Sequence, residues 1–519
     1  MRMSATVTTP ESMELGSWIS RRAAIGPDRP AVTYGDSTLT FADFQHRIDC
    51  LAAELAAGGI SAGDRVAYLG PNHPAFLTTL FACARVGATF VPLNFRLTAP
   101  EIAYILDDCG ALTLIADAAL APTVDQIRDQ TPVRRFIALG DVDGWENYDD
   151  LLARAQPIAD PAHPAPEDVA VIMYTSGTTG RPKGAMLSHG NLFWNNVNSL
   201  LSFDTLSTDI TYVSAPLFHI GGLNVTTLVT LQKGGHVVLA PGFDPAAALS
   251  AIETHRITTM FGVPAMFLFM SQVPQFQTAD LSSLRYLMCG GAPVPEPLMR
   301  KYADRGVTFA QGYGLTETAP LALVMGIDES DRKIGAAGNK VLPLSDVRLV
   351  DADNAEVPPG QPGEVCVRGP QVMTGYWKNP GATESAIDSE GWFHTGDVGR
   401  QDDDGYIYVV DRLKDMVISG GENVYPAEVE SVLYSHPAVA EVAILGVPDD
   451  KWGQAVTAVV ATVPGESVTL DELRDFAAAT LARYKLPLRV EFVDALPRNP
   501  SGKVLKYRLR EQFGAVPTP

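Results

Sequence analysis

The sequence has little cysteine and no long apolar run. Its 519 residues contain five cysteines, none of them in a CxxC pair, and an odd, sparse set is typical of reduced thiols in a cytoplasmic protein. The N-terminal segment lacks the apolar core of a signal peptide, and no uninterrupted apolar stretch of about 18 residues follows it. The sequence therefore predicts a soluble, cytoplasmic protein whose contact with membranes is peripheral at most.

Positive charge is also scarce. The chain carries 39 Lys and Arg against 60 Asp and Glu, a formal net charge of −21, which repels phosphate polymers and anionic bilayers at long range. We therefore expect no nucleic-acid partner, although a local cationic site for a small anion is compatible with this charge. Hydrophobic residues make up 46% of a chain that is long for one compact domain, so we expect two or more packed units.

Short apolar runs alternate with helical patterns through most of the chain, which predicts an α/β fold with parallel sheets covered by helices. A β-rich stretch from Val347 onward predicts a small β-barrel-like subdomain, and a small α+β unit follows it. We expect an N-terminal domain over 1–411 and a C-terminal domain over 412–519. The expected elements are a helix over 41–58, strands over 65–69, 88–91, 111–116, 257–263, 284–289, 307–311 and 406–410, and helices over 426–434 and 470–484.

The strongest local signal is the run YTSGTTGRPKG from Tyr174 to Gly184, which follows an apolar strand candidate at 169–173. Small residues let backbone N–H groups approach an anion closely, and Lys183 adds a point charge for phosphate oxygens. The run is not a Walker A loop, because GxxxxGK[ST] is absent. It favours a phosphate-binding loop over a plain Ser/Thr/Gly surface loop.

Two further motifs follow strand candidates. In QGYGLTET (311–318) glycines bracket Tyr313, whose ring could lie on a flat base, and Glu317 offers a hard oxygen ligand for Mg²⁺. In GWFHTGD (391–397) Asp397 could accept both hydroxyls of a ribose. Taken alone, an ordinary turn explains the first motif equally well and the second motif better.

Charged residues and glycines mark a junction that begins at residue 411. DRLKD (411–415) is followed by SGGENVYPAE from Ser419, which indicates a hinge and a mobile loop, or else a solvated connector. Near the end of the chain, PRNPSGK (497–503) places Lys503 on a loop, where by itself it is an ordinary exposed charge.

Together these motifs resemble the adenylate-forming superfamily, which contains acyl-CoA synthetases, 4-coumarate–CoA ligases, firefly-type luciferases and the adenylation domains of peptide synthetases. The resemblance runs from Leu15 to Phe513 and is nearest to actinobacterial fatty-acyl-CoA ligases and feruloyl/coumaroyl-CoA ligases. It implies a ligase that uses ATP, Mg²⁺ and coenzyme A. A carboxylic acid would first become an acyl-adenylate with release of pyrophosphate, and the thiol of CoA would then displace AMP.

The resemblance also implies roles for individual residues. Lys503 would bridge the acid and the α-phosphate, with Lys183, Thr316 and His219 as further catalytic residues and Glu317 as the Mg²⁺ ligand. The residues implied to bind ATP or AMP are Thr175, Ser176, Gly177, Thr178, Thr179, Gly180, Gly290, Gly291, Ala292, Gly312, Tyr313, Gly314, Asp397 and Arg412.

The same resemblance implies that the C-terminal domain is mobile. Lys414 would be the hinge between half-reactions, and Ser419, Gly420 and Gly421 would line the path of CoA. His219 would lie beside the acyl pocket, and a plain core histidine is the alternative.

The sequence does not determine which carboxylic acid is the substrate. A medium- or long-chain fatty acid is favoured, and an aromatic acid of the ferulate, 4-coumarate or benzoate type is the alternative. An adenylation module that loads a carrier protein is disfavoured, because no carrier attachment motif follows Lys503. A non-catalytic nucleotide-binding regulator is disfavoured too, because Lys183, Glu317 and Asp397 are retained together with that lysine. We expect only small-molecule partners, namely the acid, ATP and CoA, and a homodimer is compatible with the sequence.

Overall fold

The computed structural model describes residues 13–175, 182–292, 294–327, 329, 332–339, 341–412, 415–419, 422–498 and 504–514, with the backbone alone at 341, 410–412 and 423. Contacts divide the chain into two compact units. The first comprises Met1–Val347 and Val367–Phe393, and the second comprises Arg348–Cys366 and His394–Pro519. The predicted domain boundary after residue 411 lies inside the second unit and stays a prediction.

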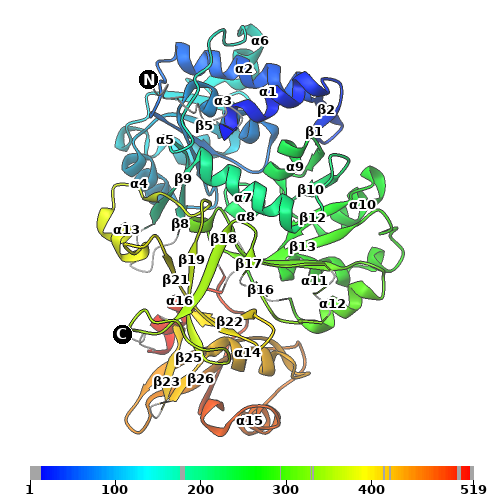
Figure 1. The fold of residues 1–519 in the computed structure, drawn as a ribbon, viewed down its shortest axis with the longest axis vertical. Helices are drawn as coiled ribbons and strands as arrows, with labels where there is room; N and C mark the ends of the chain where they lie inside the picture. Colours follow the sequence, from blue (N-terminus) through cyan, green and yellow to red (C-terminus); the bar gives the residue numbers. More distant parts are fainter. Residues whose placement is uncertain are drawn as a thin grey trace, which may run out of the picture. The chain divides into compact units, whose positions relative to one another are not determined.

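The first unit contains two large sheets (Figure 1). In one sheet, eight strands of the described chain follow the order β20-β9-β8-β4-β3-β5-β6-β7, and the strands from β8 to β7 are parallel. The hairpin partner β9 and the short edge strand β20 run antiparallel to their neighbours. The strands are β3 (Arg65–Leu69), β4 (Thr89–Leu93), β5 (Ala111–Asp117), β6 (Arg135–Leu139), β7 (Glu146–Asn147), β8 (Val169–Thr175), β9 (Lys183–Ser188) and β20 (Gly375–Tyr376).

The other large sheet has the order β15-β14-β13-β12-β10-β11-β1-β2 within the described residues. The strands from β14 to β1 are parallel, and the two edge strands are antiparallel. Carboxyl ends of parallel strands meet at one edge, which is where ligands bind in open α/β sheets. The strands are β1 (Pro30–Tyr34), β2 (Ser37–Thr40), β10 (Ile210–Val213), β11 (His236–Leu239), β12 (Thr259–Gly262), β13 (Tyr286–Gly290), β14 (Phe309–Gly314) and β15 (Leu321–Met325).

Helices of the first unit cover both sheets, and α2 shows why they form where they do. Thr40 and Asp43 make a capping box at its start, and Gly58 ends it, so the helix predicted over 41–58 is confirmed. The helices are α1 (Leu15–Ile25), α2 (Phe41–Ala57), α3 (Pro74–Val86), α4 (Ala99–Cys109), α5 (Ala121–Asp125), α6 (Tyr148–Arg154), α7 (His189–Ser202), α8 (Ile220–Asn224), α9 (Thr227–Lys233), α10 (Pro245–His255), α11 (Pro264–Gln272), α12 (Glu296–Ala303) and α13 (Pro380–Ala386).

Aromatic side chains form the centre of the core beneath these helices. Phe76 makes edge-to-face contacts with Tyr68 of β3 and Phe90 of β4, and Phe44 of α2 meets Phe81 of α3 in the same way. Buried rings therefore pack α2, α3, β3 and β4 against one another. The predicted parallel sheets covered by helices are confirmed.

The second unit is built on two further sheets. The first includes strands in the order β22-β21-β19-β18, with β21 and β22 antiparallel. It lies in the predicted β-rich stretch, and the barrel-like form of that stretch stays a prediction. The second has the order β24-β23-β26-β25, with β27 added parallel to β26. The elements are β18 (Ser345–Val350), β19 (Pro362–Arg368), β21 (Phe393–Gln401), β22 (Tyr406–Arg412), β23 (Val417–Ser419), β24 (Glu422–Val424), α14 (Pro426–Tyr434), β25 (Val439–Asp449), β26 (Gly453–Thr462), α15 (Leu470–Ala478), β27 (Arg489–Phe492) and α16 (Lys506–Phe513).

The helix predicted over 470–484 is wrong in its length. It ends at Ala478, where Thr480 N–H bonds to the carbonyl of Ala477 with the tighter spacing of a 3₁₀ turn and shares that acceptor with Leu481 N–H. The turn buries Leu481 and Leu486 in the core of this unit, which a straight helix would not do.

The structure also shows the state of the cysteines and the lengths of the apolar helices. All five cysteines are buried and none forms a disulfide bond, as the sparse set predicts. Among the helices in the described parts of the chain, none is long and apolar enough to cross a bilayer.

Candidate active site

The predicted phosphate loop connects β8 and β9. Thr175 and Lys183 are opposite each other in the antiparallel ladder, so the two ends of the loop are adjacent. Gly184 follows the lysine in a crowded place, since a Cβ there would lie 2.6 Å from Cγ2 of Ile172. The remaining predicted loop residues lie outside the described residues: Ser176, Gly177, Thr178, Thr179 and Gly180.

A chain of three side chains connects this lysine to the predicted Mg²⁺ ligand. Nζ of Lys183 lies 5.1 Å from the ring centroid of Tyr376 on β20, within the range of a cation–π contact. The phenol of Tyr376 donates a hydrogen bond of 2.9 Å to Oε1 of Glu317. Burial, followed by the charge of Glu317, raises the pKa of Tyr376, so the phenol stays protonated and keeps donating.

Glu317 is held from its backbone as well. It lies in a 3₁₀ turn at Thr316–Thr318 directly after β14, and its carbonyl accepts a 2.8 Å hydrogen bond from Met373 N–H. The residue is 8% exposed. Gly314 just before this turn has no room for a side chain, because a Cβ would lie 1.6 Å from the carbonyl oxygen of Pro320. A buried, fixed carboxylate beside a lysine suits a hard cation that carries phosphates.

The residues predicted to surround adenine converge at the same sheet edge. Gly290 ends β13 and is the parallel partner of Gly312 on β14, so positions 290–292 and 312–314 are neighbours. Gly291 has φ +81°, which favours glycine, and both it and Ala292 are exposed. Tyr313 is half-buried on the adjoining strand. Apart from Tyr313, these positions carry only glycines and Ala292, so backbone and small side chains make up most of this edge.

His219 precedes α8, after the carboxyl end of β10. Its Nε2 atom is buried and has no hydrogen-bond partner among the described residues. Burial, with a smaller contribution from the charge of Arg96, lowers the pKa of His219 to about 4, so the imidazole is neutral near pH 7. Its ring centroid is 4.6 Å from that of Phe218.

The ring of Phe261, at the end of β12, connects the histidine segment to the predicted adenine segment. A Cβ at Gly221 of α8 would lie 2.9 Å from Cζ of this ring, and a Cβ at Gly290 would lie 3.4 Å from Cε2. The two glycines therefore let an aromatic ring fill the space between α8 and β13. Sequence reasoning did not single out Phe261, because it is one aromatic residue in an apolar strand.

Asp397 lies on β21 in the second unit, where it is 5% exposed. Its register partner on β22 is Arg412, so the backbone of the two predicted ribose contacts is brought together. The preceding turn has Gly396 at φ +70°. Oε1 of Glu364 accepts a 2.9 Å hydrogen bond from Gly396 N–H, and Thr395 Oγ1 accepts a 3.1 Å bond from Asp397 N–H.

Tyr376 and Glu364 are two further residues that the sequence did not single out. The only signals were a Gly-Tyr-Trp run for the tyrosine and a Pro-Gly-Glu run for the glutamate, and both patterns are typical of many turns. Their partners are 59 and 32 residues away in the chain, so only the fold shows these hydrogen bonds.

The structure describes only some of the residues that we expect to act in the predicted C-terminal domain. Ser419 is buried on β23 and pairs with Gly453 of β26. Four predicted positions lie outside the described residues or side chains: Lys503, Lys414, Gly420 and Gly421. Their roles stay predictions.

Comparison with known proteins gives a family match over most of the chain. Residues 19–377 match the model of the AMP-binding enzyme family, and residues 428–503 match the model of the AMP-binding enzyme C-terminal domain. A feruloyl-CoA synthase of Amycolatopsis sp is 50% identical over 500 residues, which cover 96% of this chain and 99% of that protein.

Two further relatives are named for other carboxylic acids. An indoleacetate–CoA ligase of Aromatoleum aromaticum is 43% identical and covers 96% of this chain and 98% of its own. A solved structure of a fatty acyl CoA synthetase from Mycobacterium tuberculosis is 38% identical, with a TM-score of 0.79 and coverage of 97% of this chain and 99% of that one.

Proposed function

The chain belongs to the AMP-binding enzyme family, and on that premise we propose that it joins a planar aromatic carboxylic acid to coenzyme A. The predicted superfamily is thereby confirmed. The protein is an AMP-forming acid–CoA ligase that uses ATP, Mg²⁺ and CoA. The specific acid and the residue roles below are proposals.

In the first half-reaction an oxygen of the acid attacks the α-phosphate of ATP, and the bond to pyrophosphate breaks. Carboxylate and triphosphate repel each other, so cations must neutralise them and align the reacting atoms. Lys183 and the loop that starts at Thr175 bind the triphosphate, and Glu317 binds the Mg²⁺ that accompanies it. Tyr376 keeps Glu317 oriented through its hydrogen bond. Lys503 bridges the acid and the α-phosphate, and Thr316 touches that phosphate.

His219 contributes shape and polarity instead of charge. With a pKa of about 4 the imidazole is neutral at working pH, so it does not compete with the lysines for the carboxylate. Its buried Nε2 offers one polar atom to the bound acid or adenylate. Gly290, Gly291, Ala292 and the segment around Tyr313 flank the adenine, and Asp397 with Arg412 binds the ribose.

In the second half-reaction the thiolate of CoA attacks the acyl carbon, and AMP leaves with the electrons of the acyl–oxygen bond. Rotation about Lys414 replaces the Lys503 loop by the segment at Ser419, Gly420 and Gly421. One active site thus serves two chemically different steps.

The proposal of an aromatic acid is carried by one observation, the order of identities among the relatives. Identity falls from 50% for the feruloyl-CoA synthase to 43% for the indoleacetate ligase and 38% for the fatty acyl synthetase. The ring of Phe261 between Gly221 and Gly290 supports it, because an aromatic face stacks well on a planar acid. A fatty acid, favoured from the sequence alone, is the second candidate.

The test compares kcat/KM for CoA ester formation from ferulate, 4-coumarate, indoleacetate and fatty acids of increasing length. We expect the aromatic acids to exceed every fatty acid, and the reverse order would reject the proposal.

A variant pair sharpens this test. Gly221→Ala places a methyl group against Phe261, so it should raise the KM for the acid and leave the KM for ATP unchanged. Gly381→Ala is the matched control, because a Cβ there would meet no described atom within 4 Å. An equal rise in both KM values for Gly221→Ala would show that Phe261 does not line the acid site.

A further inference from the structure

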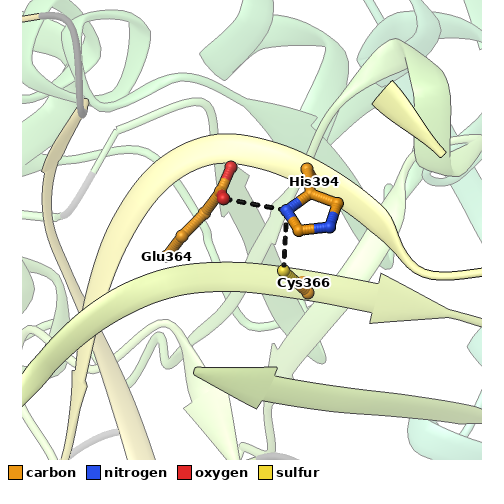
Figure 2. Close-up of side chains that lie close together, drawn as sticks. All are labelled: Glu364, Cys366 and His394. Atoms are coloured by element: carbon orange, nitrogen blue, oxygen red, sulfur yellow. Dashed lines mark hydrogen bonds and ion pairs between the residues drawn. The ribbon is translucent and has the colours of Figure 1, made fainter. Parts of the chain in front are cut away.

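Three side chains with metal-binding atoms meet in the second unit, and the ligase reaction does not use them as ligands. Figure 2 shows Glu364 and Cys366 on β19 pointing toward His394 on the neighbouring strand β21. One carboxylate oxygen, the cysteine Sγ and one imidazole nitrogen all lie within 4.8 Å of one another. Nδ1 of His394 is 2.9 Å from Oε2 of Glu364 and 3.4 Å from Sγ of Cys366.

The strand register explains why these three groups meet. Residues 364 and 366 are two apart, so their side chains share one face of β19. The third ligand comes from the adjacent strand, which is bound by a hydrogen bond from Thr395 Oγ1 to the carbonyl of Val365 at 2.7 Å. The donors are thus fixed by sheet backbone rather than by a loop, as a preorganised site requires.

The distances fit a tetrahedral ion. Zn²⁺ with bonds of about 2.0–2.1 Å to nitrogen and oxygen and about 2.3 Å to sulfur sets tetrahedral N and O ligands about 3.4 Å apart, and N and S ligands about 3.6 Å apart. The observed 2.9 Å and 3.4 Å need to widen by about 0.5 Å and about 0.2 Å to reach these values. Side-chain rotation alone supplies such shifts.

We propose that Glu364, Cys366 and His394 form a three-ligand site for Zn²⁺, with water as the fourth ligand. A thiolate, an imidazole and a carboxylate favour zinc over magnesium, which prefers oxygen ligands alone. The site is therefore chemically distinct from the Mg²⁺ that accompanies ATP. Cys366 is 0% exposed, while the side chains of Glu364 and His394 are 23% exposed or less, which gives the ion a way in from one side.

The surrounding hydrogen bonds suit a bound ion. Oε1 of Glu364 accepts from Gly396 N–H, so Oε2 can bind the metal while the other oxygen keeps the carboxylate oriented. Zinc displaces the thiol proton of Cys366 and any proton on Nδ1 of His394, and both pass to solvent. The apparent affinity must therefore rise with pH. The proposal does not rest on the identity of the acid or on any role given to Asp397.

Cobalt(II) is the probe, since it replaces zinc and reports its ligands by absorption. The full chain, stripped with a chelator, is titrated with Co²⁺ and then with Zn²⁺. We expect one ion per chain, a thiolate-to-cobalt charge-transfer band that grows with pH, and loss of that band when zinc is added.

Variants separate this site from other thiols. Cys366→Ser should abolish the charge-transfer band. Cys50→Ser should leave the band intact, and Cys50 is the matched control because its Sγ also lies near an imidazole, 3.6 Å from Nε2 of His46. Glu364→Gln should keep the band and weaken affinity by about ten- to a hundredfold, which tests the site even if Cys366→Ser fails to fold.

Absence of the band in the wild-type chain would overturn the proposal, and the three side chains would then form only a hydrogen-bonded cluster. A band that persists in Cys366→Ser or disappears in Cys50→Ser would place the cobalt elsewhere and would overturn it equally.

Discussion

Tyr376→Phe removes one oxygen atom and tests whether the hydrogen bond to Glu317 matters for nucleotide chemistry. The ring stays, so the contact with Nζ of Lys183 is retained. The hydrogen bond of 2.9 Å to Oε1 is lost. Because Glu317 is only 8% exposed, water replaces the phenol poorly, and the carboxylate loses the orientation that its proposed role as a metal ligand requires.

The size of the effect follows from the charge of the acceptor. A hydrogen bond to a charged group contributes about 1.5–3 kcal/mol, which corresponds to a loss of about 10- to 150-fold in kcat/KM for Mg-ATP. Tyr376→Leu also removes the cation–π contact and should cost a further ~0.5–2 kcal/mol. The loss should appear as a higher Mg²⁺ requirement, with the KM for the acid unchanged, because Tyr376 is a positioning residue for Glu317, the proposed metal ligand.

ATP–pyrophosphate exchange measured against Mg²⁺ concentration is the assay. Tyr302→Phe is the matched control, since its phenol makes a buried hydrogen bond of 2.8 Å to the carbonyl of Phe267 in the core of the first unit. That variant should lower stability by about 1 kcal/mol and leave exchange unchanged. Wild-type exchange and an unaltered Mg²⁺ profile in Tyr376→Phe would refute the reasoning.

Three further predictions concern other parts of the chain. Lys183→Ala should weaken both apparent ATP binding and turnover, because in its proposed role the lysine contacts the triphosphate in ground and transition states, and a change confined to the KM of the acid would contradict that role. Burial lowers the pKa of His189 to about 4, and its Nδ1 accepts from Leu15 N–H at 3.1 Å. Histidine in the unfolded chain titrates near 6.5, so below that pH the unfolded chain binds more protons than the folded one. The free energy of unfolding should therefore fall by up to about 3 kcal/mol as the pH is lowered from about 6.5 to about 4. In urea unfolding measured across this range, His189→Gln should reduce the dependence of the unfolding free energy on pH. Lys503→Ala should slow pyrophosphate release by about 10²–10³ yet convert preformed acyl-adenylate and CoA to thioester at a near-normal rate, and equal loss of both steps would argue for a fixed C-terminal domain.

The sequence was sufficient for those residues whose neighbours are set by regular structure. Parallel strands end at one edge, so the glycine motifs at 290–291 and 312–314 had to meet, and Gly290 is indeed the partner of Gly312. Lys183 lies opposite Thr175 because β8 and β9 form an antiparallel hairpin, which was not predicted from the sequence. The end of α15 could not be predicted from the sequence, because the turn after Ala478 depends on the burial of Leu481 by the rest of its unit.

The side chains that hydrogen-bond to the predicted site residues had no such signal in the sequence, and the edge strand β20 shows why. This strand has two residues, and it exists because β9 is left open at the edge of a sheet: Tyr376 pairs with Ala185, and Trp377 N–H bonds to the carbonyl of Gly184 at 2.8 Å. The strand begins at Gly375, which has φ +142°. A larger residue would not fit there, because a Cβ would lie 2.7 Å from Cγ2 of Thr383. Pairing of Tyr376 with Ala185 places the tyrosine two positions along β9 from Lys183, and the turn after β14 brings Glu317 within hydrogen-bond distance of its phenol. A segment 59 residues after the glutamate thus couples a predicted phosphate-binding lysine to a predicted metal ligand, because it completes a sheet rather than because it carries a motif.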